Sequence, residues 1–165
     1  MLLKTLLSLA SPAGPKARLS VLMFHRVTPQ PDSIFPDEMH AERFDVLCAS
    51  LKRWFNVLPL DEAARRLREG ALPSRPLCIT FDDGYADNRE VALPILQRHG
   101  LSAAFFISTG FLDGGRMWND SLIETVRACR LPELDLETLG LGRHALGNAT
   151  QKRQAAQALI RQVKY

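Results

Sequence analysis

The stretch TFDDGYAD, Thr80–Asp87, places two adjacent aspartates and a glycine directly after the apolar run Pro76-Leu77-Cys78-Ile79. A short apolar run of this kind predicts a buried strand. Polar residues just after such a strand lie where α/β proteins build their active sites. Adjacent residues point in different directions, so Asp82 and Asp83 can have different roles. One carboxylate can bind a metal ion while the other takes a proton from a metal-bound water.

Gly84 adds to the functional interpretation because glycine allows the backbone to turn sharply after the aspartate pair. The amide of Tyr85 could then point into the site and stabilise an oxyanion. The alternative is structural. In it, Asp82, Asp83 and Asp87 form an Asx-type turn and a helix cap between a strand and a helix.

The rest of the chain alternates between strand-like and helix-like patterns. Apolar runs predict strands at residues 19–24, 55–58, 77–81 and 103–107. Apolar residues at helical spacing predict helices at residues 41–54, 60–69 and 89–99, and Pro94 predicts an irregular entry into the last of these. Strands separated by helices of about ten residues indicate an α/β fold with a parallel sheet.

Composition sets the broad class of the protein. The chain has 165 residues, of which 46% are hydrophobic and 24% charged, as expected for a globular domain with a core. A net charge of +3 does not indicate a nucleic-acid partner. The apolar start, MLLKTLLSLA, is too short to span a membrane and weak as a signal peptide, so the sequence leaves the cellular location open.

Three segments resemble one known family. They are TFDDGYADN, the upstream VLMFHRV and the downstream HGLSAAFFISTGFL, and their order and spacing are similar to those of the polysaccharide deacetylases, or NodB-homology domains. The resemblance implies a distorted (β/α) barrel and hydrolysis of N- or O-acetyl groups on a glycan substrate. It also implies a divalent metal cofactor, of which zinc is the first candidate. Asp82 would be the general base, Asp83 a metal ligand and the Tyr85 amide the oxyanion donor.

The histidines depart from the family pattern. The family places two metal-binding histidines four residues apart, whereas none of His25, His40, His99 and His144 is four residues from another. We therefore expect only the N-terminal part of a barrel. Residues 1–18 would form an N-terminal arm, residues 19–120 the barrel segment, and residues 121–165 a helical insertion in which the chain stops before the rest of the barrel. Half a barrel leaves sheet edges open, so we also expect self-association.

Four further residues are candidates for the substrate site or its surroundings. His25 follows the first strand and either lines the site or lies behind it, and Thr80 would position the strand end. Trp118 and Asn119 could contact a sugar ring by stacking and hydrogen bonding, although a core position suits Trp118 equally. The alternative function is a catalytically incomplete glycan-binding or interaction fragment. Aspartyl-phosphate chemistry is disfavoured because the chain has D-D-G where that chemistry needs D-x-D.

Overall fold

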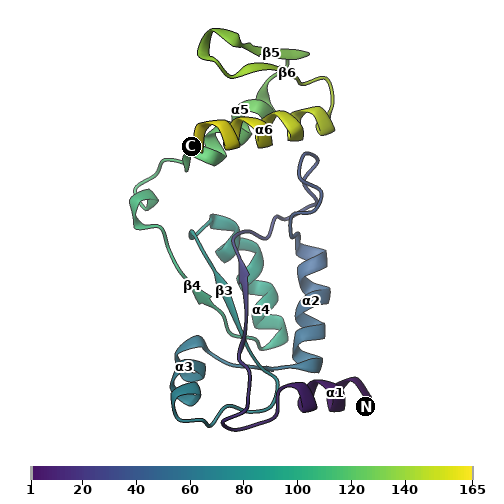
Figure 1. Ribbon diagram of the computed structural model, residues 1–165, viewed down its shortest axis with the longest axis vertical. Helices are drawn as coiled ribbons and strands as arrows, with labels where there is room; N and C mark the ends of the chain where they lie inside the picture. The colour runs from purple at the N-terminus through teal and green to yellow at the C-terminus, as the bar shows by residue number, and fades with distance from the viewer. Residues whose placement is uncertain (1, 165) are drawn as a thin grey trace. The chain divides into compact units, whose positions relative to one another are not determined.

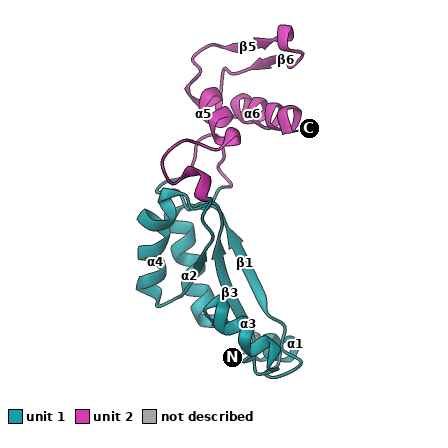
Figure 2. Ribbon diagram, turned by 90° about the vertical axis from the view of Figure 1, so that its left-hand side faces the viewer, with its two compact units in different colours: residues 1–31, 38–108 teal, residues 32–37, 109–165 magenta. Residues whose placement is uncertain are grey.

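The computed structural model describes residues 2–164 and divides the chain into two compact units. The first comprises Met1–Pro31 and Glu38–Ser108, and the second comprises Asp32–Asp37 and Thr109–Tyr165 (Figure 2). No helix among the described residues combines the length and the apolar character needed to cross a membrane.

A parallel sheet forms the centre of the first unit (Figure 1). Its middle strand is β3 (Pro76–Phe81), which pairs along its length with β1 (Ser20–Phe24), from Ser20 opposite Leu77 to Phe24 opposite Phe81. On the other side, β2 (Asn56–Val57) pairs with the start of β3, and β4 (Ala104–Phe105) pairs with its end. The predicted parallel α/β sheet is confirmed. β1 is an edge strand, and self-association through such an edge stays a prediction.

Helices α2 (Ala41–Trp54) and α4 (Leu93–His99) pack together against the sheet (Figure 1). The core that they share with the sheet contains four phenylalanines, whose ring centroids lie 5.0–5.9 Å apart in the contacting pairs: Phe24, Phe44, Phe81 and Phe105. Helix α3 (Leu60–Arg68) packs at Cys78 through its buried Ala63. All six residues of β3 are buried, in keeping with a sequence in which Thr80 is the one polar residue.

The entry into α4 is irregular, as the proline predicts. A π-helical turn, η1 (Asn88–Ala92), precedes the α-helix, and Pro94 occupies its first turn. Proline is tolerated there because the amide it lacks would have no partner within the helix. Gly100 ends α4 in the left-handed conformation, with φ of 62°.

The predicted N-terminal arm begins with α1 (Leu2–Ala10) and continues to β1. It is attached to the segment that leads into β3. The Gly14 amide donates to the Leu72 carbonyl at 2.8 Å, and the Arg75 amide donates to the Ser11 carbonyl at 2.9 Å. The arm is therefore hydrogen-bonded to the first unit along part of its length.

The second unit contains two helices and a hairpin (Figure 2). After the 3₁₀ turn η2 (Thr109–Phe111) come α5 (Trp118–Ala128), antiparallel β5 (Glu133–Leu136) and β6 (Gly142–Ala145) joined through the 3₁₀ turn η3 (Glu137–Leu139), and then α6 (Ala149–Lys164). The sequence predicts a helical insertion from residue 121, whereas this unit begins at Thr109 and includes a hairpin. The hairpin forms because apolar and polar residues alternate in β5, so that Leu134 and Leu136 pack into the core of the second unit.

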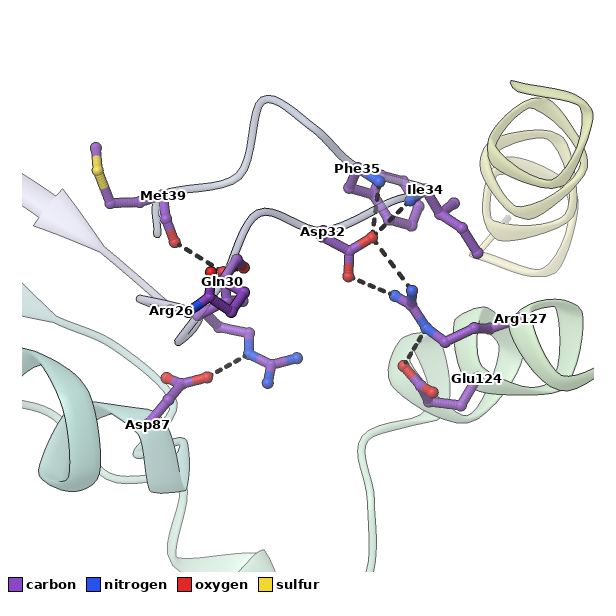
Figure 3. Close-up of polar contacts among 10 residues, drawn as sticks. Arg26, Gln30, Asp32, Ile34, Phe35, Met39, Asp87, Glu124 and Arg127 are labelled. Atoms are coloured by element: carbon purple, nitrogen blue, oxygen red, sulfur yellow. Dashed lines mark hydrogen bonds and ion pairs between the residues drawn. The ribbon is translucent and has the colours of Figure 1, made fainter. Parts of the chain in front are cut away.

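Residues Asp32–Asp37 belong to the second unit although they lie between β1 and α2 in the sequence. The Asp32 carboxylate accepts hydrogen bonds from Arg127 Nη2 at 2.7 Å and Nη1 at 3.2 Å (Figure 3). It also accepts bonds from the amides of Ile34 and Phe35, at 2.8 and 2.9 Å. Burial alone would raise the pKa of Asp32, but the Arg127 guanidinium and the two amides hold it below its ordinary value. Phe35 packs into the core of the second unit.

We expect Arg127→Gln to lower the free energy of unfolding of the second unit by about 1–3 kcal/mol, the cost of leaving a partly buried carboxylate without its charged partner. Because the pKa of Asp32 is lowered by folding, the pair stabilises the protein above the ordinary Asp value of 3.8 and loses this effect as the pH falls through the lowered pKa. Urea unfolding followed by Trp118 fluorescence, in a Trp54→Phe background, measures both effects.

Arg130→Gln is the matched control, because Arg130 is exposed in the same unit and should change the unfolding free energy by less than about 0.5 kcal/mol. Equal losses in the two variants would show that the Asp32–Arg127 pair does not stabilise the unit.

The three free thiols should differ in reactivity. Burial raises the pKa of Cys48 to about 11, with a further contribution from the Asp45 charge, and burial raises the pKa of Cys78. Cys129 is only partly buried. In the native protein at pH 8, iodoacetamide should therefore alkylate Cys129 and spare the other two, as peptide mass spectrometry would show. Denaturant should make all three react. Rapid labelling of Cys48 in the native protein would contradict the buried position of this side chain on α2.

Candidate functional site

The site forms where β1 and β3 end side by side. Because Phe24 and Phe81 are opposite each other in the parallel register, the residues that follow them emerge at the same edge of the sheet. The Asp82 amide extends the ladder by one bond, donating to the Phe24 carbonyl at 2.8 Å. Beyond it, His25 Nε2 lies 3.9 Å from Asp83 Oδ2. The structure thus brings His25 to the aspartate pair, as its place after the first strand predicts.

Both carboxylates of the pair are accessible to a ligand. Asp82 is half-buried, the Asp83 side chain is 29% exposed, and the His25 side chain is 52% exposed. Tyr85 is also half-buried. An imidazole and a carboxylate at this separation can act on one small ligand, because neither is enclosed by the core.

The turn that carries the pair has an unusual backbone. Asp83 and Gly84 both have φ of 74°, which is uncommon for a residue with a side chain. A Cβ added to Gly84 would lie 2.9 Å from Ile107 Cγ2, so the segment after β4 leaves no room for one. The Ser108 amide donates to the Asp83 carbonyl at 3.3 Å. The turn is therefore held against the segment that follows β4.

Thr80 lies at the end of β3 and is buried. Its Oγ1 donates to the Leu22 carbonyl at 3.4 Å. This bond links β3 to β1 two residues before Asp82. This position suits the predicted role of supporting the strand end and gives Thr80 little access to a substrate.

Asp87 holds an ion pair that local sequence patterns do not reveal. Its carboxylate, 8% exposed, accepts a hydrogen bond from Arg26 Nε at 2.8 Å (Figure 3) and one from the Val27 amide at 3.4 Å. Asp87 is the residue before η1 but makes no side-chain cap to it, so the helix-cap alternative does not apply to this residue. The Arg26 guanidinium lies 4.7 Å from the centre of the Tyr85 ring.

Trp118 and Asn119 belong to the second unit, at the start of α5. Trp118 is 48% exposed, so its ring is available to a ligand rather than being buried in a core. Their predicted contact with a sugar stays a prediction.

The donor set for a metal is small. Among residues 2–164, no three side chains of His, Cys, Asp or Glu come close enough together to hold an ion. A catalytic zinc commonly has three protein ligands, and Asp83 with the neighbouring His25 provides two candidates at most. The described residues therefore do not form a complete zinc site.

A family model described as polysaccharide deacetylase matches residues 69–161, which include the Asp82–Asp83 turn. The chain belongs to the polysaccharide deacetylase family. Within that family it is 30% identical over 92 residues to YxkH of Bacillus subtilis (strain 168), a proposed polysaccharide deacetylase. The match covers 55% of this chain and 32% of YxkH.

Solved structures of deacetylases have a similar fold. A de-N-acetylase from Aggregatibacter actinomycetemcomitans is 26% identical with a TM-score of 0.50, over 59% of this chain and 40% of that one. The Streptococcus pyogenes deacetylase PplD, solved with acetate, is 21% identical with a TM-score of 0.50, over 66% of this chain and 52% of PplD. The predicted fold class, part of a NodB-type α/β barrel, is confirmed. This polysaccharide deacetylase chain spans about a third to a half of the length of these relatives.

Gly84→Ala should destabilise the first unit by about 2–4 kcal/mol, because the new Cβ adds overpacking against Ile107 to the strain of a positive φ. Gly100→Ala is the matched control in the same unit. Its φ is 62° but the nearest atom to a new Cβ is Lys52 Nζ at 3.9 Å, so only the conformational cost of about 1 kcal/mol applies. Urea unfolding of both variants tests the difference, and equal losses would contradict the close approach at Ile107.

Proposed function

We propose that this chain contributes catalytic residues to a hydrolase that removes acetyl groups from a polysaccharide or amino sugar by cleaving a non-peptide amide bond. The observation that supports this most is the placement of Asp82 and Asp83 on a strained turn next to His25, in a chain of the polysaccharide deacetylase family. Strained, polar and accessible turns at strand ends are typical of active sites.

In this proposal each residue has a separate role. Asp82 is the general base that takes a proton from the attacking water. The water oxygen bonds to the acetyl carbonyl carbon, and the Tyr85 amide donates a hydrogen bond to the oxyanion that develops there. When the carbon–nitrogen bond breaks, the amine leaves with a proton and the acetyl group leaves as acetate. His25, beside Asp83, is placed where an imidazole could hold or deliver a proton.

We also propose a divalent metal, zinc first, with Asp83 as one ligand. A metal would relieve the repulsion between two adjacent carboxylates and would polarise the acetyl group. The two-donor arrangement of His25 and Asp83 is short of a catalytic site, so the complete ligand set must include groups besides these. We expect the 165-residue chain alone to bind zinc weakly.

A second candidate function is glycan binding without catalysis. It is favoured by the lack of a three-donor group among residues 2–164. In that case the exposed Trp118 ring would carry affinity for the acetylated glycan, and Asp82 would be dispensable.

Asp82→Asn should lower the deacetylation rate by about 10²- to 10⁴-fold, the range for a general base, and largely spare metal content. Asp83→Asn should instead deplete bound metal, because it removes a ligand. The assay is acetate release from an acetylated chito-oligosaccharide by the protein that contains this chain, with metal content measured by elemental analysis.

Asp61→Asn, on the exposed face of α3, is the control and should retain wild-type turnover. Wild-type turnover in the Asp82 variant would contradict the role of general base. Glycan binding without acetate release in the wild-type protein would favour the second candidate function.

A further inference from the structure

The loop after β1, which carries His25 and Arg26, and the loop after β3, which carries Asp82, Asp83 and Asp87, are connected by the Asp87 carboxylate. The Asp82 amide makes the last backbone hydrogen bond from the end of β3 to β1. Beyond it, two hydrogen bonds between the loops run to Asp87, which accepts one from Arg26 Nε (Figure 3) and one from the Val27 amide, in addition to the approach of His25 to Asp83. Arg26 directly follows His25, and Asp87 lies four residues after Asp83.

The loop that follows β3 needs such a connection because it contains two unfavourable features. One is the positive φ of Asp83. The other is Asn88, whose buried Oδ1 and Nδ2 atoms have no hydrogen-bond partner among residues 2–164. Strained and unsatisfied groups persist only where other interactions over-determine the conformation. The Arg26–Asp87 ion pair, in which Asp87 is buried and Arg26 is exposed, is placed to do so.

We propose that Asp87 is a positioning residue of this site. By binding Arg26 and the Val27 amide, its carboxylate holds the His25 loop against the loop that carries Asp82 and Asp83. Arg26 extends the effect to Tyr85, because its guanidinium covers the ring of the residue whose amide is assigned to the oxyanion. The proposal rests on the roles proposed above for Asp82, Asp83 and Tyr85. Asp87 itself takes no direct part in the reaction.

A purely structural ion pair would stabilise the whole unit, whereas a positioning pair acts mainly on the site loops. Hydrogen exchange separates the two, because local opening speeds exchange only in the affected segment. Three amides report on the loops: Asp82, bonded to Phe24; Asn88, bonded to Tyr85; and Ser108, bonded to Asp83. The central amides of β3 report on the unit as a whole.

In Asp87→Asn, we expect the amides of Asp82, Asn88 and Ser108 to exchange at least tenfold faster relative to β3, measured by NMR on the 165-residue chain. Arg26→Lys should give the same pattern, because lysine keeps the charge but lacks the Nε group that reaches Asp87 and the flat surface that covers Tyr85. It also serves if Asp87→Asn folds poorly.

Asp45→Asn is the matched control. Asp45 also accepts a hydrogen bond from an arginine at 3.0 Å, but this bond joins α2 to Arg98 of α4 rather than the two loops of the site. It should leave the three reporter amides unchanged relative to β3. Uniformly faster exchange through β3 and the loops in the Asp87 and Arg26 variants, or no change in the loops, would overturn the proposal. The measurement needs neither metal nor glycan, so its result is independent of the acetate-release assay.

Discussion

The burial of β3 is the constraint on which the first unit depends. Its six residues are all buried, so each face and each edge of this strand must be covered by another part of the chain. β1 covers one edge along its whole length, and two short strands share the other. At the carboxyl end of the strand, burial ends at Phe81, and Asp82 and Asp83 are only partly buried. A charged pair such as Asp82 and Asp83 can be accommodated there, because hydration is lost everywhere earlier along the strand.

Much of this arrangement could be predicted from local patterns. The apolar runs place β1 and β3, and helical spacing gives α2 with its bounds as predicted. β2 and β4 are only two residues long, shorter than their apolar runs predict, because each pairs with only two of the six residues of β3. The sequence does not predict the hairpin of the second unit, because Pro132 and nearby glycines obscure the alternation around Leu134 and Leu136.

The site divides in the same way. Asp82, Asp83 and His25 could be found because each follows an apolar run, and parallel strands bring such positions to one edge. The Arg26–Asp87 pair joins residues 61 apart, and the sequence suggests only a local turn or cap for Asp87. The sequence around Asp87 does not indicate that Arg26 is its ion-pair partner. Contacts that connect loops depend on the register of the whole sheet, so sequence patterns within a short window cannot specify them.

The loop between β1 and α2 has a consequence for how the chain can be divided. Its base is closed within the first unit, where the Thr28 amide donates to the Met39 carbonyl and the Ala41 amide to the Thr28 carbonyl, both at 2.9 Å. Its tip, Asp32–Asp37, supplies Phe35 and the Asp32 carboxylate to the second unit. A piece cut from Thr109 onward would lack part of its own core and the anion that faces Arg127. During synthesis, Asp32 emerges 95 residues before its partner Arg127, so the second unit can complete its folding only after most of the chain has been made.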